Sequence, residues 1–290
     1  MKRPIELRRV RDFGQVINDS VTFLKENFRP LFISLFAICG FFLVLGTVTT
    51  VFAYAKMSEM YGGGLENVQD GRLDYLVSLF ISLGVLLLTQ SCIHLVTVCY
   101  ISVYLQKNNT KPTLAEVWGY FRYYILRVIG SSLVIWLLVA TGFLLCIIPG
   151  IYIAPIVSLI VPIIVIENAS FGYAFNTSFR LIKENWWSTF GVIFVTSLIV
   201  GVMGSFAGYP LTFVAMGSKF LSLHNIRMPL IIFFSALRNL LTLAYTLPYI
   251  ATCLCYLNLA EQKDGLGLLG RIELFGKSSD DSLNLPTEEY

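Results

Sequence analysis

Two groups of polar side chains recur at helical spacing within apolar stretches of this sequence, and they are its main candidates for chemistry. Gln90, His94 and Thr97 stand three and four residues apart, so a helix would place them on one face. Such groups within a membrane suit a proton relay or a path for a polar substrate, because hydrocarbon offers them no partners. The alternative is packing, in which each side chain bonds a neighbouring helix for about 0.6 kcal/mol.

The second group begins with an arginine and continues with hydroxyl groups. Its members are Arg238, Thr242, Tyr245 and Tyr249. The guanidinium could bind an anionic headgroup or a carboxylate such as that of Asp74, or it could extend to the outer membrane surface from a buried stem. Both groups are expected to face the interior of a helix bundle. They would border a wet cleft with Arg238 near its outer mouth, or fill a dry core.

The other reactive residue types form no catalytic or metal-binding pattern. The chain has two histidines and six cysteines, and the cysteines lie in apolar stretches without partners at zinc-ligand spacing. Glu167, Asn168 and Ser170 stand where an apolar stretch ends, which favours helix capping over catalysis. We therefore predict no catalytic residue, metal site or cofactor.

Composition predicts that these residues are positioned by membrane helices. Hydrophobic residues make up 56% of the 290 and charged residues only 13%. A soluble domain needs roughly a quarter charged residues to cover its surface. Basic residues are spread along the chain, so no nucleic-acid partner is expected. The predicted partners are the lipid bilayer and, for a complex subunit, other membrane proteins.

Apolar segments long enough to cross a bilayer core, about 20 residues as helix, occur six times. Pro149 and Gly150 divide an uncharged stretch that is too long for one span, which predicts a tight helical hairpin. Pro155 and Pro162 predict kinks in the fourth segment. The predicted fold class is all-α, a polytopic membrane helix bundle with spans at 31–54, 75–104, 128–147, 151–166, 191–216 and 229–259.

The lysines and arginines are unevenly divided between the two ends of these spans. Most of the 21 lie on the side that holds both termini, many of them before the first span. Positive charge near span ends marks the cytoplasmic side. We therefore predict that the N- and C-termini are cytoplasmic.

Residues 13–32 and 171–190 resemble each other, sharing a Phe-Gly start and a Lys-Glu-Asn run. Apolar residues recur in both at helical spacing, which predicts amphipathic helices that lie in the membrane interface or pack on the bundle as cytoplasmic helices. A third copy begins at Thr113, which forms a capping box with Glu116. The predicted organisation is one membrane domain, 1–262, with parallel units at 10–104, 113–166 and 170–260, followed by a partly disordered cytoplasmic tail, 263–290.

A recognisable motif begins at the end of the fourth apolar segment. Its residues are Val165, Ile166, Glu167, Asn168, Ala169, Ser170, Ala174, Ser178, Arg180, Leu181, Lys183, Asn185, Trp186 and Trp187. With this motif the chain resembles, over most of its length, a family of bacterial six-helix membrane proteins that includes the membrane domain of glycerophosphoryl diester phosphodiesterases. The resemblance implies a polytopic bundle in a bacterial cytoplasmic (inner) membrane, without a particular activity.

Four of these residues are also candidates for the membrane interface. Trp186 and Trp187 are typical of the aromatic belt, with Arg180 and Lys183 close by. For the whole chain, the predicted function is a non-enzymatic scaffold, accessory subunit or export helper. The alternative is a transporter or lipid-handling protein that uses the polar faces of the second and sixth spans.

Overall fold

The computed structural model describes residues 7–62, 65–145, 147–216 and 226–265, and this part of the chain is helical without a strand. The predicted all-α class is confirmed for these residues, and six long apolar helices are compatible with the predicted multi-pass architecture. Gly63, Gly64, Cys146, His224 and the tail beyond residue 265 lie outside the described residues. Helices long and apolar enough to cross a membrane cover Phe13–Glu59, Arg72–Gln106, Leu114–Leu144, Ile147–Ile166, Trp186–Met216 and Arg227–Asp264.

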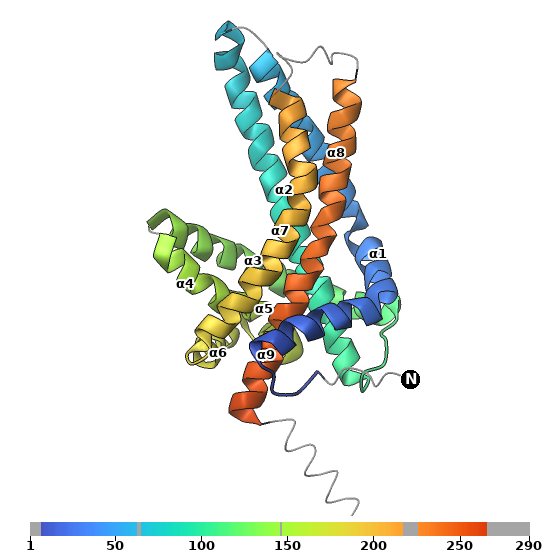
Figure 1. Ribbon diagram of the computed structural model, residues 1–290, viewed down its shortest axis with the longest axis vertical. Helices are drawn as coiled ribbons and strands as arrows, with labels where there is room; N and C mark the ends of the chain where they lie inside the picture. The colour runs from blue at the N-terminus through green and yellow to red at the C-terminus, as the bar shows by residue number, and fades with distance from the viewer. Residues whose placement is uncertain (1–6, 63–64, 146, 217–225, 266–290) are drawn as a thin grey trace, which may run out of the picture.

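The first two helices are longer than a bilayer requires. α1 (Phe13–Gly62) has 50 residues and α2 (Leu65–Gln106) has 42. The expected amphipathic helix and first span are one continuous helix with Pro30 inside it. In Figure 1 the first part of α1 runs across the base of the bundle before the rest rises. Pro30 gives α1 a physical reason to bend, because proline removes an amide donor and clashes with a carbonyl one turn earlier.

The third and fourth spans form a tight hairpin, as predicted, but the turn lies elsewhere. α3 (Leu114–Leu145) is followed by α4 (Ile147–Ser158), so Pro149 and Gly150 belong to α4. The first turn of a helix tolerates proline because the amide there needs no intrahelical partner. The two helices touch closely, since a Cβ on Gly142 would lie 3.1 Å from Gly150 Cα. Figure 1 shows this hairpin projecting sideways from the lower half of the bundle.

Prolines interrupt the fourth and sixth spans. α4 contains Pro155 and ends at Ser158, and α5 (Ile160–Ile166) completes the fourth span, which confirms the predicted interruption. The sixth span consists of α8 (Arg227–Leu241), a 3₁₀ segment η2 (Thr242–Tyr245) and α9 (Thr246–Asp264). The 3₁₀ segment lies one turn before Pro248, whose ring excludes an α-helical bond to the carbonyl of Ala244.

The chain passes from the fourth span to the fifth through α6 (Phe171–Ile182). The Ser170 side chain accepts a hydrogen bond from the Tyr173 amide, so Ser170 is the N-cap, one of the capping residues expected. A turn then leads into α7 (Trp186–Met216). The segment matching the start of α1 is thus a separate helix here.

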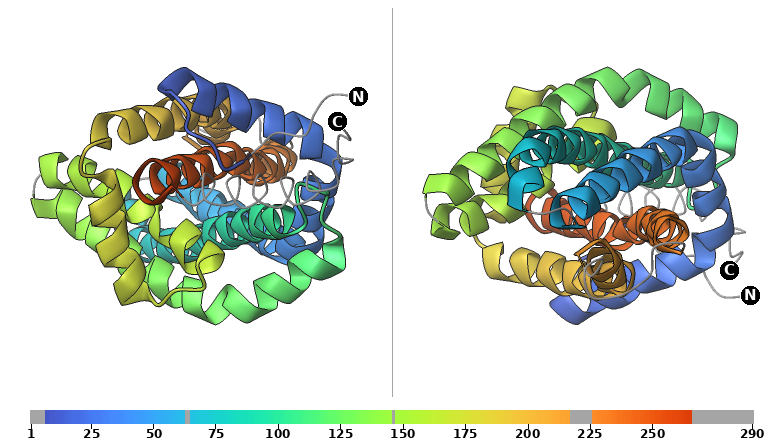
Figure 2. Two further views of the ribbon diagram at one scale, coloured as in Figure 1. Left: turned by 90° about the horizontal axis from the view of Figure 1, so that it is seen from below. Right: turned by 90° about the horizontal axis from the view of Figure 1, so that it is seen from above.

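The core lies where α2, α5 and α9 meet. These three helices contact one another, and Cys99, Ile163 and Ile250 on them are fully buried. Seen along the long axis, α2 and α9 are enclosed by α1, α3 and α7 (Figure 2). The last helical segment of each predicted unit therefore lies in the centre.

Candidate functional site

The polar faces of α2 and α9 meet in a side-chain cluster. The Tyr249 hydroxyl donates a hydrogen bond to Gln90 Oε1 at 2.9 Å. The Tyr249 ring also stacks on the His94 imidazole, with ring centroids 4.3 Å apart and planes at 12°. His94 Nε2 is enclosed and has no hydrogen-bond partner among the described residues. The structure thus brings together residues from both predicted polar stripes.

A cavity of about 250 Å³ lies beside this cluster, between α2, α3, α4, α5 and α9. Three serines contribute to its wall, Ser91, Ser132 and Ser158. Ser91 donates its proton to Leu87 O and Ser158 donates to Pro155 O, so both oxygens keep lone pairs for a donor in the cavity. The rest of the wall is apolar or aromatic and consists of Ile135, Trp136, Val139, Ala154, Val157 and Val161.

A second cavity of about 380 Å³, also lined by Gln90, lies between α1, α2, α7, α8 and η2. Gln90 lines both cavities, so its bond with Tyr249 lies at their boundary. The α7 wall is made of small residues, which leave the space open. The residues that face the second cavity from the predicted stripe and from α7 are Arg238, Thr242, Tyr245, Gly201, Gly204, Ser205 and Gly208.

Arg238 lines the second cavity and a neighbouring one of about 290 Å³. Its Nη1 donates to the Tyr54 hydroxyl at 3.1 Å, and the guanidinium lies 5.9 Å from the Tyr54 ring centroid. The pairing with Asp74, one of the alternatives for this arginine, is not formed, and no described carboxylate makes an ion pair with Arg238. A partly buried guanidinium whose protein partner is a neutral phenol can bind an anion.

A polar contact between α1 and α8 positions Arg238. Asn239 Nδ2 donates to Thr50 Oγ1 at 3.3 Å and to Ser235 O at 2.9 Å. Gly46 allows this approach, because a Cβ there would lie only 2.7 Å from Asn239 Oδ1. Sequence reasoning missed Tyr54, Asn239 and Gly46. The signal that could have found Asn239 is an amide next to Arg238 within an apolar span.

Some of the other polar residues predicted to face the interior are buried away from the two cavities, and others line the second cavity. Thr97 is fully buried and donates to Ile93 O, and it lines neither of the two main cavities. Thr242 donates to Asn239 O at 2.6 Å while lining the second cavity. The Tyr245 ring lies 6.5 Å from that of Tyr249 and links the arginine end of the stripe to the histidine cluster.

The predicted interfacial residues gather around a groove of about 840 Å³ formed by α4, α6 and α7. Trp186 Nε1 donates to Tyr152 O at 3.0 Å, and its ring stacks on Tyr152. Trp187 is exposed. Arg180 forms an ion pair with Asp264 at 3.6 Å, and Lys183 lines the same groove.

Comparisons with protein-family models, with curated proteins and with solved structures found no match. The family resemblance of residues 165–187 therefore stays a prediction. Within the described ranges, no group of three or more histidine, cysteine, aspartate or glutamate side chains is placed to hold a metal ion.

Proposed function

We propose that this multi-pass membrane protein binds an amphipathic molecule inside its bundle, as a lipid-handling protein or transporter. The observation that carries the proposal is the enclosed Nε2 atom of His94, which has no partner among the described residues and belongs to a side chain that lines a cavity. A buried polar atom left unpaired costs about 1–3 kcal/mol, so a bound polar group would relieve that cost. The apolar wall around Trp136 would hold the hydrocarbon part.

The charge of the ligand follows from Arg238. A guanidinium within a span needs a counter-charge, and none comes from the described carboxylates. An anionic headgroup in the second cavity would supply it. Arg238 and Tyr249 are separated by about three helical turns, or roughly 16 Å. The ligand class that fits this stripe is therefore an anionic amphiphile.

The same proposal includes the membrane location of the protein, its orientation and its organisation into units. The distribution of basic residues supports cytoplasmic termini in a bacterial inner membrane. The meeting of α2, α5 and α9 at the centre supports three parallel units, each ending in one of these helices. The course of α1 across the base supports an interfacial role for its first part.

The test uses a photoreactive fatty acid carrying a diazirine on its chain, added to the purified full-length protein in neutral detergent. Irradiation followed by peptide mass spectrometry should place the label on residues that line the two cavities. Arg238→Gln should reduce that labelling by about tenfold, the effect of losing one charge-assisted bond. Arg72→Gln is the matched control, because Arg72 is exposed on α2 and lines neither cavity. Equal labelling of both variants would contradict the proposal.

A scaffold or accessory-subunit function is a second candidate, favoured by the α7 surface. A Cβ added to Gly204 or Gly208 would meet nothing within 4 Å beyond its own helix. Both glycines face the second cavity, and small residues four apart let a partner transmembrane helix approach closely, so a partner helix would occupy that cavity in place of a lipid. A pull-down in mild detergent should then recover a stoichiometric membrane partner, which Gly204→Ile should displace. Recovery of the same partner with Gly204→Ile would reject this surface.

A further inference from the structure

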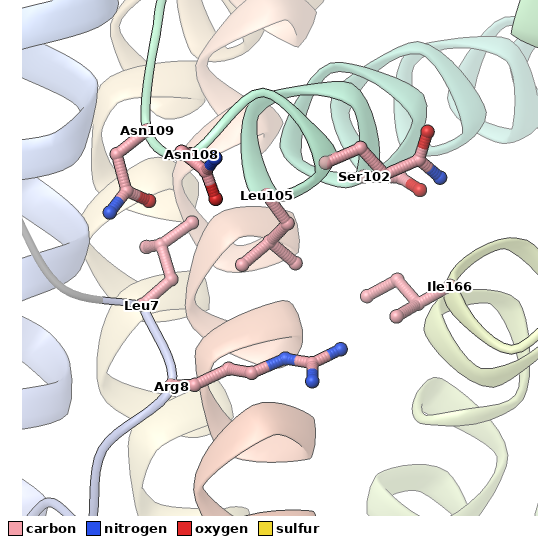
Figure 3. A pocket seen from close by; sticks show the side chains of 8 residues that line it. Leu7, Arg8, Ser102, Leu105, Asn108, Asn109 and Ile166 are labelled. Atoms are coloured by element: carbon pink, nitrogen blue, oxygen red, sulfur yellow. The ribbon is translucent and has the colours of Figure 1, made fainter. Parts of the chain in front are cut away.

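A separate pocket lies at the basal end of the bundle, defined as the end where α1 begins and α9 ends. Figure 3 shows residues that border it, from the segment before α1, the end of α2, the turn that follows and the end of α5. Its volume of about 360 Å³ falls within the range of small-molecule sites. Leu7, Leu105 and Ile166 provide apolar surface, whereas the other lining residues are polar.

Arg8 places a positive charge at this basal pocket, and no described residue forms an ion pair with it. Its side chain extends beneath Leu105 toward Ile166 (Figure 3), and no described residue hydrogen-bonds its guanidinium. The neighbouring arginines differ, since Arg9 and Arg11 both contact Asp19 Oδ2, at 2.7 and 2.8 Å. Glu167, the residue after Ile166, accepts a hydrogen bond from the Tyr256 hydroxyl and forms no ion pair with Arg8.

Ser102 supplies a second, independent observation. Its side chain lines the pocket and is only 2% exposed, yet its hydroxyl has no hydrogen-bond partner among the described residues. Many buried hydroxyls here, such as those of Ser20 and Thr97, donate to a carbonyl one turn earlier. The hydroxyls of Ser58 and Ser235 are enclosed and lack a partner among the described residues, but they do not line this pocket. The Ser102 hydroxyl, unlike these two, is not enclosed, so it borders accessible space, where a ligand or water can bond it.

Amide groups complete the polar wall. Gln106 Oε1 accepts a hydrogen bond from the Tyr120 hydroxyl, which leaves its NH₂ group as a donor. Asn108 and Asn109 have positive φ angles of 50° and 66°, a conformation that asparagine tolerates better than most residues. This turn places both asparagines on the pocket wall. The guanidinium, the hydroxyl and the amides are all able to donate.

The segment that carries Arg8 is fixed in place by its neighbours. The Arg11 amide donates to Asn258 Oδ1 at 2.8 Å, and Asn258 Nδ2 donates back to Arg11 O at 3.1 Å. The Arg11 guanidinium also binds Leu7 O at 2.7 Å. A ligand would therefore meet Arg8 on a backbone that is already ordered, which lowers the entropy cost of binding.

We infer that the basal pocket binds a phosphate group, carried by a soluble small molecule or by a lipid headgroup. A guanidinium with separate hydroxyl and amide donors matches the several oxygens of phosphate better than the two of a carboxylate. The inference does not depend on the function proposed for the bundle interior. The basal pocket shares no lining residue with the two cavities of the bundle interior.

The first arm of the test titrates inorganic phosphate calorimetrically into the full-length protein in a neutral, lipid-depleted detergent. Arg8→Gln should weaken binding by about tenfold or more, and Ser102→Ala by several-fold. Ser102→Ala removes a hydroxyl that bonds no described residue, so its melting temperature should match the wild type. Arg29→Gln is the control, because Arg29 has the same charge, is exposed and does not line the pocket.

The second arm distinguishes the source of the phosphate group. Nanodiscs of phosphatidylcholine are compared with nanodiscs that also contain phosphatidylglycerol, and tightly retained lipids are counted by native mass spectrometry. Phosphate binding that requires Arg8 assigns a soluble ligand. Retention of phosphatidylglycerol that requires Arg8, without phosphate binding, assigns a lipid headgroup. If neither signal distinguishes Arg8→Gln from Arg29→Gln, the inference is wrong.

Discussion

The imidazole of His94 on α2 lies parallel to the phenol ring of Tyr249 on α9, with ring centroids 4.3 Å apart. The same tyrosine donates its hydroxyl proton to Gln90, one helical turn from His94. One aromatic side chain therefore joins the two polar stripes, at the boundary between the two cavities. A binding role and a packing role for this junction lead to opposite expectations for a His94 variant.

His94→Leu should reduce labelling by the photoreactive fatty acid without lowering the melting temperature. The variant loses a ring stack of about 0.5–1.5 kcal/mol, but it also removes an unpaired polar atom that costs about 1–3 kcal/mol. Scanning fluorimetry in detergent and photolabelling measure the two effects on one sample. In a dry core the opposite pattern is expected, with a lower melting temperature and unchanged labelling.

Gly46→Ala should destabilise the contact between α1 and α8. The new Cβ would lie 2.7 Å from Asn239 Oδ1, so the amide must rotate away from Thr50 and Ser235, at a cost of about 1–3 kcal/mol. Gly40→Ala is the matched control on α1, because a Cβ there meets nothing within 4 Å. Alanine favours helix over glycine, so Gly40→Ala should leave the melting temperature equal or raise it. Equal melting temperatures for the two variants would contradict the assigned contact.

Arg11→Gln and Arg9→Gln should differ strongly in stability although both arginines contact one oxygen of Asp19. The Arg11 side chain is 0% exposed and that of Arg9 is 43% exposed. Arg11→Gln leaves Asp19 paired with Arg9 but removes two buried bonds of the Arg11 guanidinium, to Asp19 and to Leu7 O, each worth about 1.5–3 kcal/mol. An exposed pair, by contrast, contributes about 0–1 kcal/mol. Thermal unfolding in detergent measures both. A larger loss for Arg9→Gln would mean that Arg9, not Arg11, holds Asp19.

Membrane orientation can be tested with single cysteines in intact spheroplasts. Gly63→Cys should react with an impermeant maleimide added from outside, and Lys111→Cys should not, because the positive charges predict a cytoplasmic side for Lys111. Lys111 is preferred to Asn108, whose φ of 50° would strain most replacements. The described native cysteines are buried, which limits background reaction. Reversed labelling would invert the proposed topology.

The sequence by itself determined the helical class, the six helices long and apolar enough to cross a membrane, and several of their interruptions. These properties are local, since about 20 apolar residues in a row suffice for a span and one proline suffices to break a helix. The Ser170 cap and the break before Pro162 were accessible for the same reason. The turn between α3 and α4 was placed too late, because proline fits the first turn of a helix as well as a loop.

The tertiary structure alone decided which polar groups meet. Periodicity put His94 and Tyr249 each on a helix face, but it could not say that these faces touch or that Thr97 belongs to packing. Nothing in the sequence indicated that Gly46 is a contact residue. Its lack of a side chain matters only because the Asn239 side chain packs against it in the folded protein. Arg8 and Ser102 share a pocket because distant segments meet at the basal end. Such contacts depend on how helices pack across the whole chain, and local sequence patterns do not encode that packing.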